Sequence, residues 1–331
     1  VLESPDMNLK TDTLYLDRSN SKAFYNSFGT ILDEKRKLTS IKGIYFMDEK
    51  KYRFISKVKI DDPEYLLNSE RLDYYTESDK AFFYGKTTIV GGEYDIYCEK
   101  GTYDTQFQRG NFQENAVIFY DNKEIRGDSL YFENEKNYAA ATNNVSVIDT
   151  LNKSVINGHY GEIFKAKDSA IITRRALAVN IIDQDSLYIH ADTLIATGPT
   201  EKKILRGYYD VRIFKTDLRG KSDSLHLDQS TGLIKLLKLP LNRKENQILT
   251  TSQKNKKNPV LWFGKSQMSG DKIFLTSDMQ TKKLDSLKII GNSWIIERDS
   301  ISDTGFNQIK GGVLDGLFKE GELREIDVSK N

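Results

Sequence analysis

The sequence contains little cysteine, little proline and almost no net charge. Its 331 residues include one cysteine, Cys98, and five prolines, and 49 basic residues are balanced by 48 acidic ones. A single cysteine excludes an intramolecular disulfide and a two-cysteine metal site. The balance of charge argues against a nucleic-acid-binding protein, which normally carries a basic excess. Few prolines suit long β-ladders, because proline lacks the amide that a ladder uses.

Long apolar runs are also missing. The longest is the five-residue run Ala116–Tyr120, so no segment suits a membrane-spanning helix. Helical stretches of about 12 residues with apolar side chains at i, i+3 and i+4 are absent as well. The chain begins at Val1 without a methionine or an apolar signal segment, which favours a processed chain.

A short unit recurs along the chain, in which an acidic residue is followed two positions later by Leu or Ile and four positions later by another apolar residue. The first three copies begin 58 residues apart, and a second unit, Gly-x-Tyr, falls between them. The acidic copies begin at Asp12, Glu70, Asp128, Asp192, Asp223 and Asp271, and the Gly-x-Tyr copies begin at Gly43, Gly101 and Gly158. A fixed period of this kind is typical of stacked repeat proteins.

Within each unit the apolar side chains alternate with polar ones, which is the period of a β-strand. Leu130 and Phe132 share a face with Asp128 in this pattern, and Asn143-Asn144 predicts a turn between short strands. Coils of about 30 residues would each form one rung of a stack that buries a continuous interior. The alternation predicts that these side chains point inward: Leu72, Leu130, Phe132, Val145, Val147, Leu225, Leu227, Ile273 and Leu275.

The sequence therefore predicts an all-β protein. We expect residues 1–331 to form one continuous repeat domain, with a looser second half from about residue 190. A solvated loop is expected at about 238–259, a stretch rich in Lys, Asn, Gln and Ser.

Residues with catalytic chemistry do not gather in this repeat. The acids that head the units are expected to accept turn amides or to lie at a solvated rim, rather than to form a catalytic or metal-binding ladder. His159, His190 and His226 fall in three different registers, which argues against a metal site. Neither a Gly-x-Ser-x-Gly elbow nor a phosphate-binding glycine loop occurs. The sequence predicts no catalytic residues, no metal and no cofactor.

Several runs of the chain resemble the OstA-like, or lipopolysaccharide-transport bridge, repeat. They are Ile125–Phe132, Ala140–Asp149, Leu187–Leu194, Asp217–Leu225, Asn258–Phe263 and Phe306–Gly311. The resemblance covers most of Leu9 to Val328. It implies an elongated open β-jellyroll, taco-like in section, of stacked antiparallel strands with an apolar interior groove. It also implies a non-enzymatic protein of the periplasm, with outer-membrane association left open, that carries lipopolysaccharide or a related glycolipid between the two membranes.

The resemblance assigns the acyl chains of the lipid to the groove. The expected groove residues are Leu14, Leu16, Leu72, Tyr74, Leu130, Phe132, Val145, Val147, Val211, Ile213, Leu225, Leu227, Ile273 and Leu275. The expected protein partners are other β-jellyroll transport proteins, or a second copy of the chain, joined by edge-to-edge strand pairing. Two alternatives stay open at this point, a carbohydrate-active stacked-β enzyme and a purely structural repeat protein, because a groove and a packed core need the same apolar face.

Overall fold

The computed structural model describes residues 2–3, 8–32, 35–92, 94–182, 185–199, 202–239, 258–281, 283–299, 305–319 and 322–329. In these ranges the chain is built from β-strands with one short 3₁₀ helix, and the strands pair in antiparallel fashion. The predicted all-β class of stacked antiparallel strands is confirmed. No helix in the described ranges is long and apolar enough to cross a membrane.

The chain divides into two compact units, Val1–Thr150 and Leu151–Asn331. The expectation of one continuous repeat domain stays a prediction. Most of the loop expected at about 238–259 lies outside the described residues, which stop at Leu239 and resume at Asn258.

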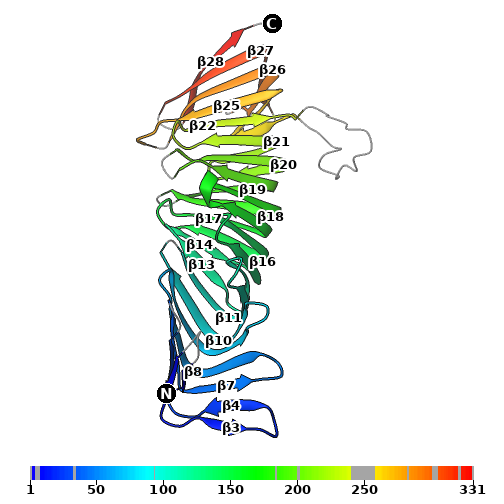
Figure 1. Ribbon diagram of the computed structural model, residues 1–331. Helices are drawn as coiled ribbons and strands as arrows, with labels where there is room; N and C mark the ends of the chain where they lie inside the picture. Colours follow the sequence, from blue (N-terminus) through cyan, green and yellow to red (C-terminus); the bar gives the residue numbers. More distant parts are fainter. Residues whose placement is uncertain are drawn as a thin grey trace, which may run out of the picture. The chain divides into compact units, whose positions relative to one another are not determined.

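The described residues of the first unit form sixteen strands that stack largely in chain order (Figure 1). They are β1 (Leu2–Glu3), β2 (Asn8–Thr11), β3 (Tyr15–Asp17), β4 (Lys22–Tyr25), β5 (Gly29–Leu32), β6 (Lys37–Ser40), β7 (Lys42–Phe46), β8 (Lys51–Asp61), β9 (Tyr65–Tyr75), β10 (Lys80–Gly91), β11 (Asp95–Asp104), β12 (Arg109–Gln113), β13 (Val117–Tyr120), β14 (Lys123–Arg126), β15 (Ser129–Glu133) and β16 (Tyr138–Asp149).

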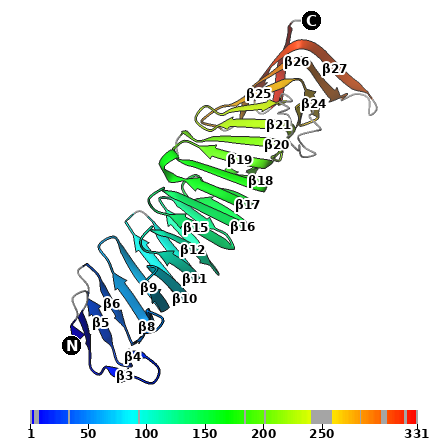
Figure 2. The same ribbon diagram turned by 45° about the vertical axis from the view of Figure 1, so that its right-hand side comes forward.

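In the part of the second unit that the structure describes, the chain forms η1 (Lys165–Lys167) and twelve strands, of which β17 to β21 lie side by side in chain order (Figure 2). The strands are β17 (Ser154–Phe164), β18 (Ser169–Ile182), β19 (Asp185–Thr197), β20 (Ile204–Phe214), β21 (Leu218–Asp228), β22 (Leu233–Leu237), β23 (Val260–Phe263), β24 (Ser266–Ser269), β25 (Lys272–Ser277), β26 (Leu284–Arg298), β27 (Phe306–Lys319) and β28 (Glu322–Ser329).

Within each unit, the sheet folds over along a line that we call the corner. Long strands run through the corner, whereas shorter neighbours are interrupted there. One half of β8 pairs with β7 and its other half pairs with β6, and in the second unit β21 pairs in the same way with β23 and β22. The two halves of a folded strand therefore carry apolar side chains that face a shared interior.

The corner is built from consecutive residues with left-handed backbone angles. In β8 these are Ser56 and Lys57, and in β16 they are Asn143 and Asn144. On β9, the single residue Glu70 lies opposite the pair in β8, which is the arrangement of a β-bulge. Left-handed angles cost most L-residues about 1–2 kcal/mol, and Asn tolerates them better than most. The double Asn at the corner of β16 follows from this preference.

The acids of the repeated unit lie at this corner. Asp128 is exposed, its amide donates to the carbonyl of Asn143 at 3.0 Å, and its carboxylate accepts from Nδ2 of Asn144 at 3.0 and 3.1 Å. In the second unit, the Asp271 carboxylate accepts from Nδ2 of Asn292 at 3.2 Å to each oxygen. Asp128 and Asp271 thus each tie one strand to a left-handed asparagine of another.

Two details of the sequence interpretation are wrong at this point. Asp128 does not share the inward face of Leu130, because the alternation of faces breaks at the corner and the carboxylate points to solvent. Asn143-Asn144 is not a turn between strands, since β16 continues through it from Tyr138 to Asp149. The nine side chains predicted to point inward are all buried, which confirms the alternation away from the corner.

A series of substitutions at Asn144 separates its backbone role from its side-chain role. We expect Asn144→Gly to lower the free energy of unfolding by about 1 kcal/mol, the value of a lost hydrogen bond to a charged group in an exposed place. Asn144→Ala should cost about 1–2 kcal/mol more, because alanine is strained at the left-handed φ of this position. Urea denaturation of the unmodified chain and of the two variants measures the free energies of unfolding. Equal stability of the Gly and Ala variants would contradict the assigned backbone strain.

Candidate functional site

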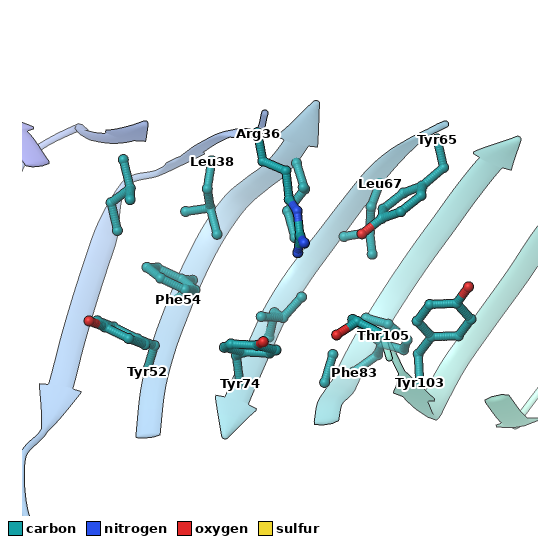
Figure 3. Close-up of a pocket in the computed structure, with 14 residues that line it drawn as sticks. Arg36, Leu38, Tyr52, Phe54, Tyr65, Leu67, Tyr74, Phe83, Tyr103 and Thr105 are labelled. Carbon is teal, nitrogen blue, oxygen red and sulfur yellow. The ribbon is translucent and has the colours of Figure 1, made fainter. Parts of the chain in front are cut away.

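The described interior of the first unit contains an apolar cavity of about 150 Å³. It lies between the two halves of the folded sheet: Phe54, Leu72 and Phe83, which pair across neighbouring strands, line it from one half. Leu38 and Leu67 line it from the other half (Figure 3). Its lining is mostly apolar, which suits an apolar ligand.

A second apolar cavity, of about 80 Å³, adjoins the first, since both are lined by Ile31, Tyr52 and Phe54. Its other walls include Leu9, Leu14 and Tyr45, from strands nearer the start of the chain. Together, the two cavities are lined mostly by apolar side chains, which come from strands between Leu9 and Thr105.

The Tyr25 ring closes one wall of the smaller cavity. Its hydroxyl is 2.7 Å from Oγ of the buried Ser40. A Cβ atom on Gly29 or Gly43 would lie about 2.5 or 2.4 Å from the ring, so both positions need glycine. The glycine of the first Gly-x-Tyr unit therefore makes room for an aromatic wall.

A polar chamber of about 540 Å³ adjoins the first cavity on another side. The chamber and the apolar cavity share Arg36, Tyr65, Tyr103 and Thr105. Nε of Arg36 is 3.2 Å from the Asp62 carboxylate. In Figure 3, the Arg36 guanidinium extends between Leu38 and Leu67 toward the strand that carries Tyr74. This cation therefore lies where apolar and polar surfaces meet.

The tyrosines of this region remain uncharged at any physiological pH. Burial raises the pKa of Tyr65 to about 12 and that of Tyr52 to about 12. Burial, together with the neighbouring Tyr94 and Tyr65, also raises the pKa of Tyr103. Their hydroxyls are consequently available as neutral donors and acceptors of hydrogen bonds.

An ion-pair cluster on the outer face holds β8 and β9 in the register that builds the cavity. Asp73 is 2% exposed and lies 2.6 Å from Nη2 of Arg53 and 3.3 Å from Nη2 of Arg71. Burial alone would raise the pKa of the Asp73 carboxyl, but the hydrogen bonds from both arginines outweigh burial and lower it. On the inner face, the neighbours of Arg53 and Asp73 line the cavity, so the cluster fixes the spacing of the lining residues.

The predicted groove residues fall into three groups. Leu72 and Tyr74 line the larger cavity and Leu14 the smaller one, although Leu14 is also 40% exposed. Leu16 is 61% exposed and lines none of the cavities described above. The remaining predicted residues are buried: Leu130, Phe132, Val145, Val147, Val211, Ile213, Leu225, Leu227, Ile273 and Leu275.

Burial is complete at several interior positions outside the cavities. In the first unit Phe112, Ile125 and Leu130 have no exposed surface, and in the second unit Leu261 and Ile273 have none. The ring of Tyr94, at the chamber, also packs against Phe132 with a centroid distance of 4.5 Å. The interior therefore contains cavities around residues 9–108, and these other positions are fully buried.

Sequence reasoning missed most of the cavity lining. The repeated units do not contain Phe54, Tyr65 or Phe83. Arg36 also falls outside them, between the unit that begins at Asp12 and the unit that begins at Gly43. One signal was present, because the tyrosines of two Gly-x-Tyr units, Tyr45 and Tyr103, line the cavities.

Reactive groups do not gather here. Cys98 is buried, and burial raises the pKa of its thiol to about 12. Across the described ranges, no three His, Cys, Asp or Glu side chains lie close enough together to hold a metal ion. Burial, with Arg206 and Lys235 nearby, lowers the pKa of His226 in the second unit.

The lowered pKa of Asp73 predicts a pH-dependent effect of Arg53→Gln. The ionised form of Asp73 is favoured in the folded state, so its contribution to stability is present above about pH 4 and is lost as pH falls through the lowered pKa. We expect Arg53→Gln to cost about 2 kcal/mol at pH 7 and progressively less below pH 4, in urea denaturation.

The matched control is Arg212→Gln, which removes an exposed ion pair with Asp210 at 2.9 Å. It should cost less than about 1 kcal/mol. A cost for Arg53→Gln that is as small, or that does not change with pH, would contradict the structural role of the cluster.

The chain was compared with curated proteins, solved structures and models of protein families. A search of curated proteins gave no match. Among solved structures, the chain is similar to LptH, the LptA-homologous periplasmic component of the conserved lipopolysaccharide transport device from Pseudomonas aeruginosa. The two are 17% identical with a TM-score of 0.30, over 33% of this chain and 82% of that chain. The model of the family described as OstA-like protein matches residues 1–70. Residues 1–70 are therefore similar to that family, in agreement with the resemblance that the sequence motifs indicated.

Proposed function

We propose that this chain is a non-enzymatic lipid-binding protein of the periplasm, which carries lipopolysaccharide or a related glycolipid between the inner and outer membranes. The observation that supports the proposal most directly is the apolar lining that extends from Leu9 to Thr105 beside a polar chamber. An interior of this kind suits an amphiphile, with its acyl tail among the apolar side chains.

The energetic basis is the transfer of methylene groups out of water. Each buried methylene contributes about 0.8 kcal/mol, so eight of them contribute roughly 6 kcal/mol. A cavity of 150 Å³ matches part of one acyl chain, and the adjoining cavity extends the apolar path toward Leu9. The aromatic walls at Tyr52, Phe54 and Phe83 supply a large contact area for such a chain.

The motif acids support a non-enzymatic protein over a carbohydrate-cleaving one. Asp128 and Asp271 accept hydrogen bonds from corner asparagines, so these two carboxylates have a structural task. A carbohydrate-cleaving ladder would need paired acids facing a substrate channel instead.

Photo-crosslinking from adjacent residues tests the proposed tail site. A benzophenone amino acid at Tyr74, which lines the cavity, should form an adduct with lipid in cells, because its ring faces the tail. The same residue at Tyr75 is the matched control, since Tyr75 packs against Phe82 on the outer face at a centroid distance of 5.4 Å.

Mass spectrometry of the adduct would identify an acylated glycolipid if the proposal is right. Absence of any lipid adduct at position 74, or equal adducts at both positions, would contradict it and favour a purely structural repeat.

We also propose that related jellyroll proteins, or a second copy, pair with the strand edges. Within the described residues β3 pairs with β4 alone, and β28 pairs with β27 alone. Unpaired backbone groups at such edges favour strand addition. Cysteines placed on β3 and β28 should therefore crosslink to a partner, while a cysteine at Tyr84 on an outer face should not. Monomers in scattering, with no crosslink to any candidate partner, would rule out edge pairing.

A further inference from the structure

Both tryptophans of the chain lie on one outer face of the second unit. Trp262 is in β23 and Trp294 is in β26. Their sequence neighbours Leu261 and Ile295 are buried, whereas the two tryptophans are half-buried, so the indole rings stand on the outer side of the sheet. Two large aromatic side chains are thus held at the surface instead of in the interior.

A row of exposed side chains crosses the neighbouring strands to Trp262. Tyr188 of β19 lies opposite Phe214 of β20. Phe214 lies opposite Arg219 of β21, which in turn lies opposite Trp262. Tyr188 is 40% exposed and Phe214 is 47% exposed, and their ring centroids are 6.1 Å apart. Aromatic rings and a cation therefore share one row on the outside of the sheet.

A second row on the same face leads to Trp294. Lys221 of β21 lies opposite Val260 of β23, and Ser269 of β24 connects Val260 to Trp294. The two rows are two residues apart along each strand, so they are neighbours on one surface. We call the aromatic and basic members of both rows the outer patch: Tyr188, Phe214, Arg219, Lys221, Trp262 and Trp294.

The two cations of the outer patch lie over aromatic rings. The guanidinium carbon of Arg219 is 5.4 Å from the centroid of the Phe214 ring. Nζ of Lys221 is 5.8 Å from the centroid of the Trp262 ring. In the part of the chain that the structure describes, neither cation makes an ion pair. Their charges are therefore not neutralised by a described acid.

Three acids beside the outer patch are already paired with other bases. Asp210 is 2.9 Å from Nη2 of Arg212, and Nζ of Lys215 is 3.8 Å from Asp185 and 3.9 Å from Asp217. The outer patch thus has a local excess of positive charge, although the whole chain is close to neutral. This charge is complementary to an anionic partner.

The arrangement of rings and cations favours a lipid bilayer over a glycan. A sugar packs against the open face of an aromatic ring, but cations cover one face of the Phe214 and Trp262 rings. At a bilayer surface, Trp and Tyr rings lie at the level of the headgroups. Lys and Arg side chains are attracted there by anionic phospholipids. Both groups of the outer patch therefore find their preferred surroundings at one depth.

We infer that the outer patch docks the second unit on a lipid bilayer that contains anionic phospholipids. The aromatic rings enter the headgroup layer, and Arg219 and Lys221 contact the lipid phosphates. The patch lies on the outside of a sheet in the second unit, whereas the proposed tail site is inside the first unit. The inference thus goes beyond the proposed function and does not depend on it.

The two tryptophans supply a built-in probe, because the chain has no others. Vesicles of equal parts phosphatidylglycerol and brominated phosphatidylcholine should quench their fluorescence, since bromine atoms quench nearby indoles. In vesicle sedimentation, we expect the full chain to bind these vesicles about tenfold or more tightly than vesicles of phosphatidylcholine alone. Added salt should reduce this difference, because it screens exposed charges.

A pair of matched double variants locates the contact. Phe214→Ser with Arg219→Gln should weaken binding to the anionic vesicles by about tenfold. The control is Phe107→Ser with Arg109→Gln in the first unit, where Phe107 is 49% exposed and the Arg109 guanidinium carbon is 4.9 Å from its ring centroid. The control makes the same chemical change outside the outer patch, so its affinity should match that of the unmodified chain. Circular dichroism establishes that both variants are folded.

The outcomes separate bilayer docking from tail binding. Ala81→Phe, which fills the apolar cavity, should bind the vesicles as tightly as the unmodified chain. Loss of vesicle binding in that variant would assign the binding to the cavity and overturn the inference. Equal affinity for anionic and neutral vesicles, unquenched tryptophans, or equal losses in the two double variants would also overturn it, while the tail site would stand.

Discussion

One half of this sheet covers the apolar face of the other half. For that, each strand must either bend or be interrupted along the same line. The first unit meets this constraint with left-handed residue pairs such as Ser56-Lys57 and Asn143-Asn144, which let a long strand pass through the corner with its ladder intact on both sides. The shorter neighbours break at the corner instead, and one half of β8 pairs with β7 and the other with β6. The cavity exists because the halves of β8, β9 and β10 face each other across the interior.

The corner also explains the acids of the repeat. An acid at the break between two half-strands can reach the asparagine of the facing corner, as Asp128 does with Asn144 and Asp271 with Asn292. These carboxylates stabilise an amide donor that sits in a strained backbone region. For Asp128 and Asp271, the repeated acid makes a structural contact with the corner of another strand.

The sequence was sufficient to predict which side chains are buried in the strands where apolar and polar residues alternate without a break. Leu130 and Phe132 are buried as their alternation predicts, and so are Ile273 and Leu275 at the other end of the chain. Prediction failed where the period breaks: Asp128 is exposed, and Leu16 is 61% exposed on the short strand β3. A period of two cannot reveal a corner, because the corner changes which face a residue occupies without changing the residue types around it.

The site was harder to predict than the fold, for a physical reason. Leu72 and Leu130 occupy equivalent positions of the repeat and both are buried, yet Leu72 lines the larger cavity and Leu130 lines none of the cavities described above. The repeat predicts which side chains are buried, whereas the cavity also depends on side chains outside the repeated units, such as Phe54 and Phe83. The chemistry of the chamber also depends on a fold contact, since Arg36 and Asp62 are far apart in sequence and paired in space.

The central claim is that the apolar cavity of the first unit holds a lipid tail, and filling that cavity tests it most directly. Ala81 is 5% exposed and lines the cavity, so Ala81→Phe places a ring in the space assigned to the tail. The measurement is the molar ratio of lipid to protein after purification from a cell envelope, with circular dichroism to establish that the variant is folded. We expect folded Ala81→Phe protein to carry little or no lipid, whereas the unmodified chain carries it. A folded variant that retains the lipid content of the unmodified chain would contradict the account.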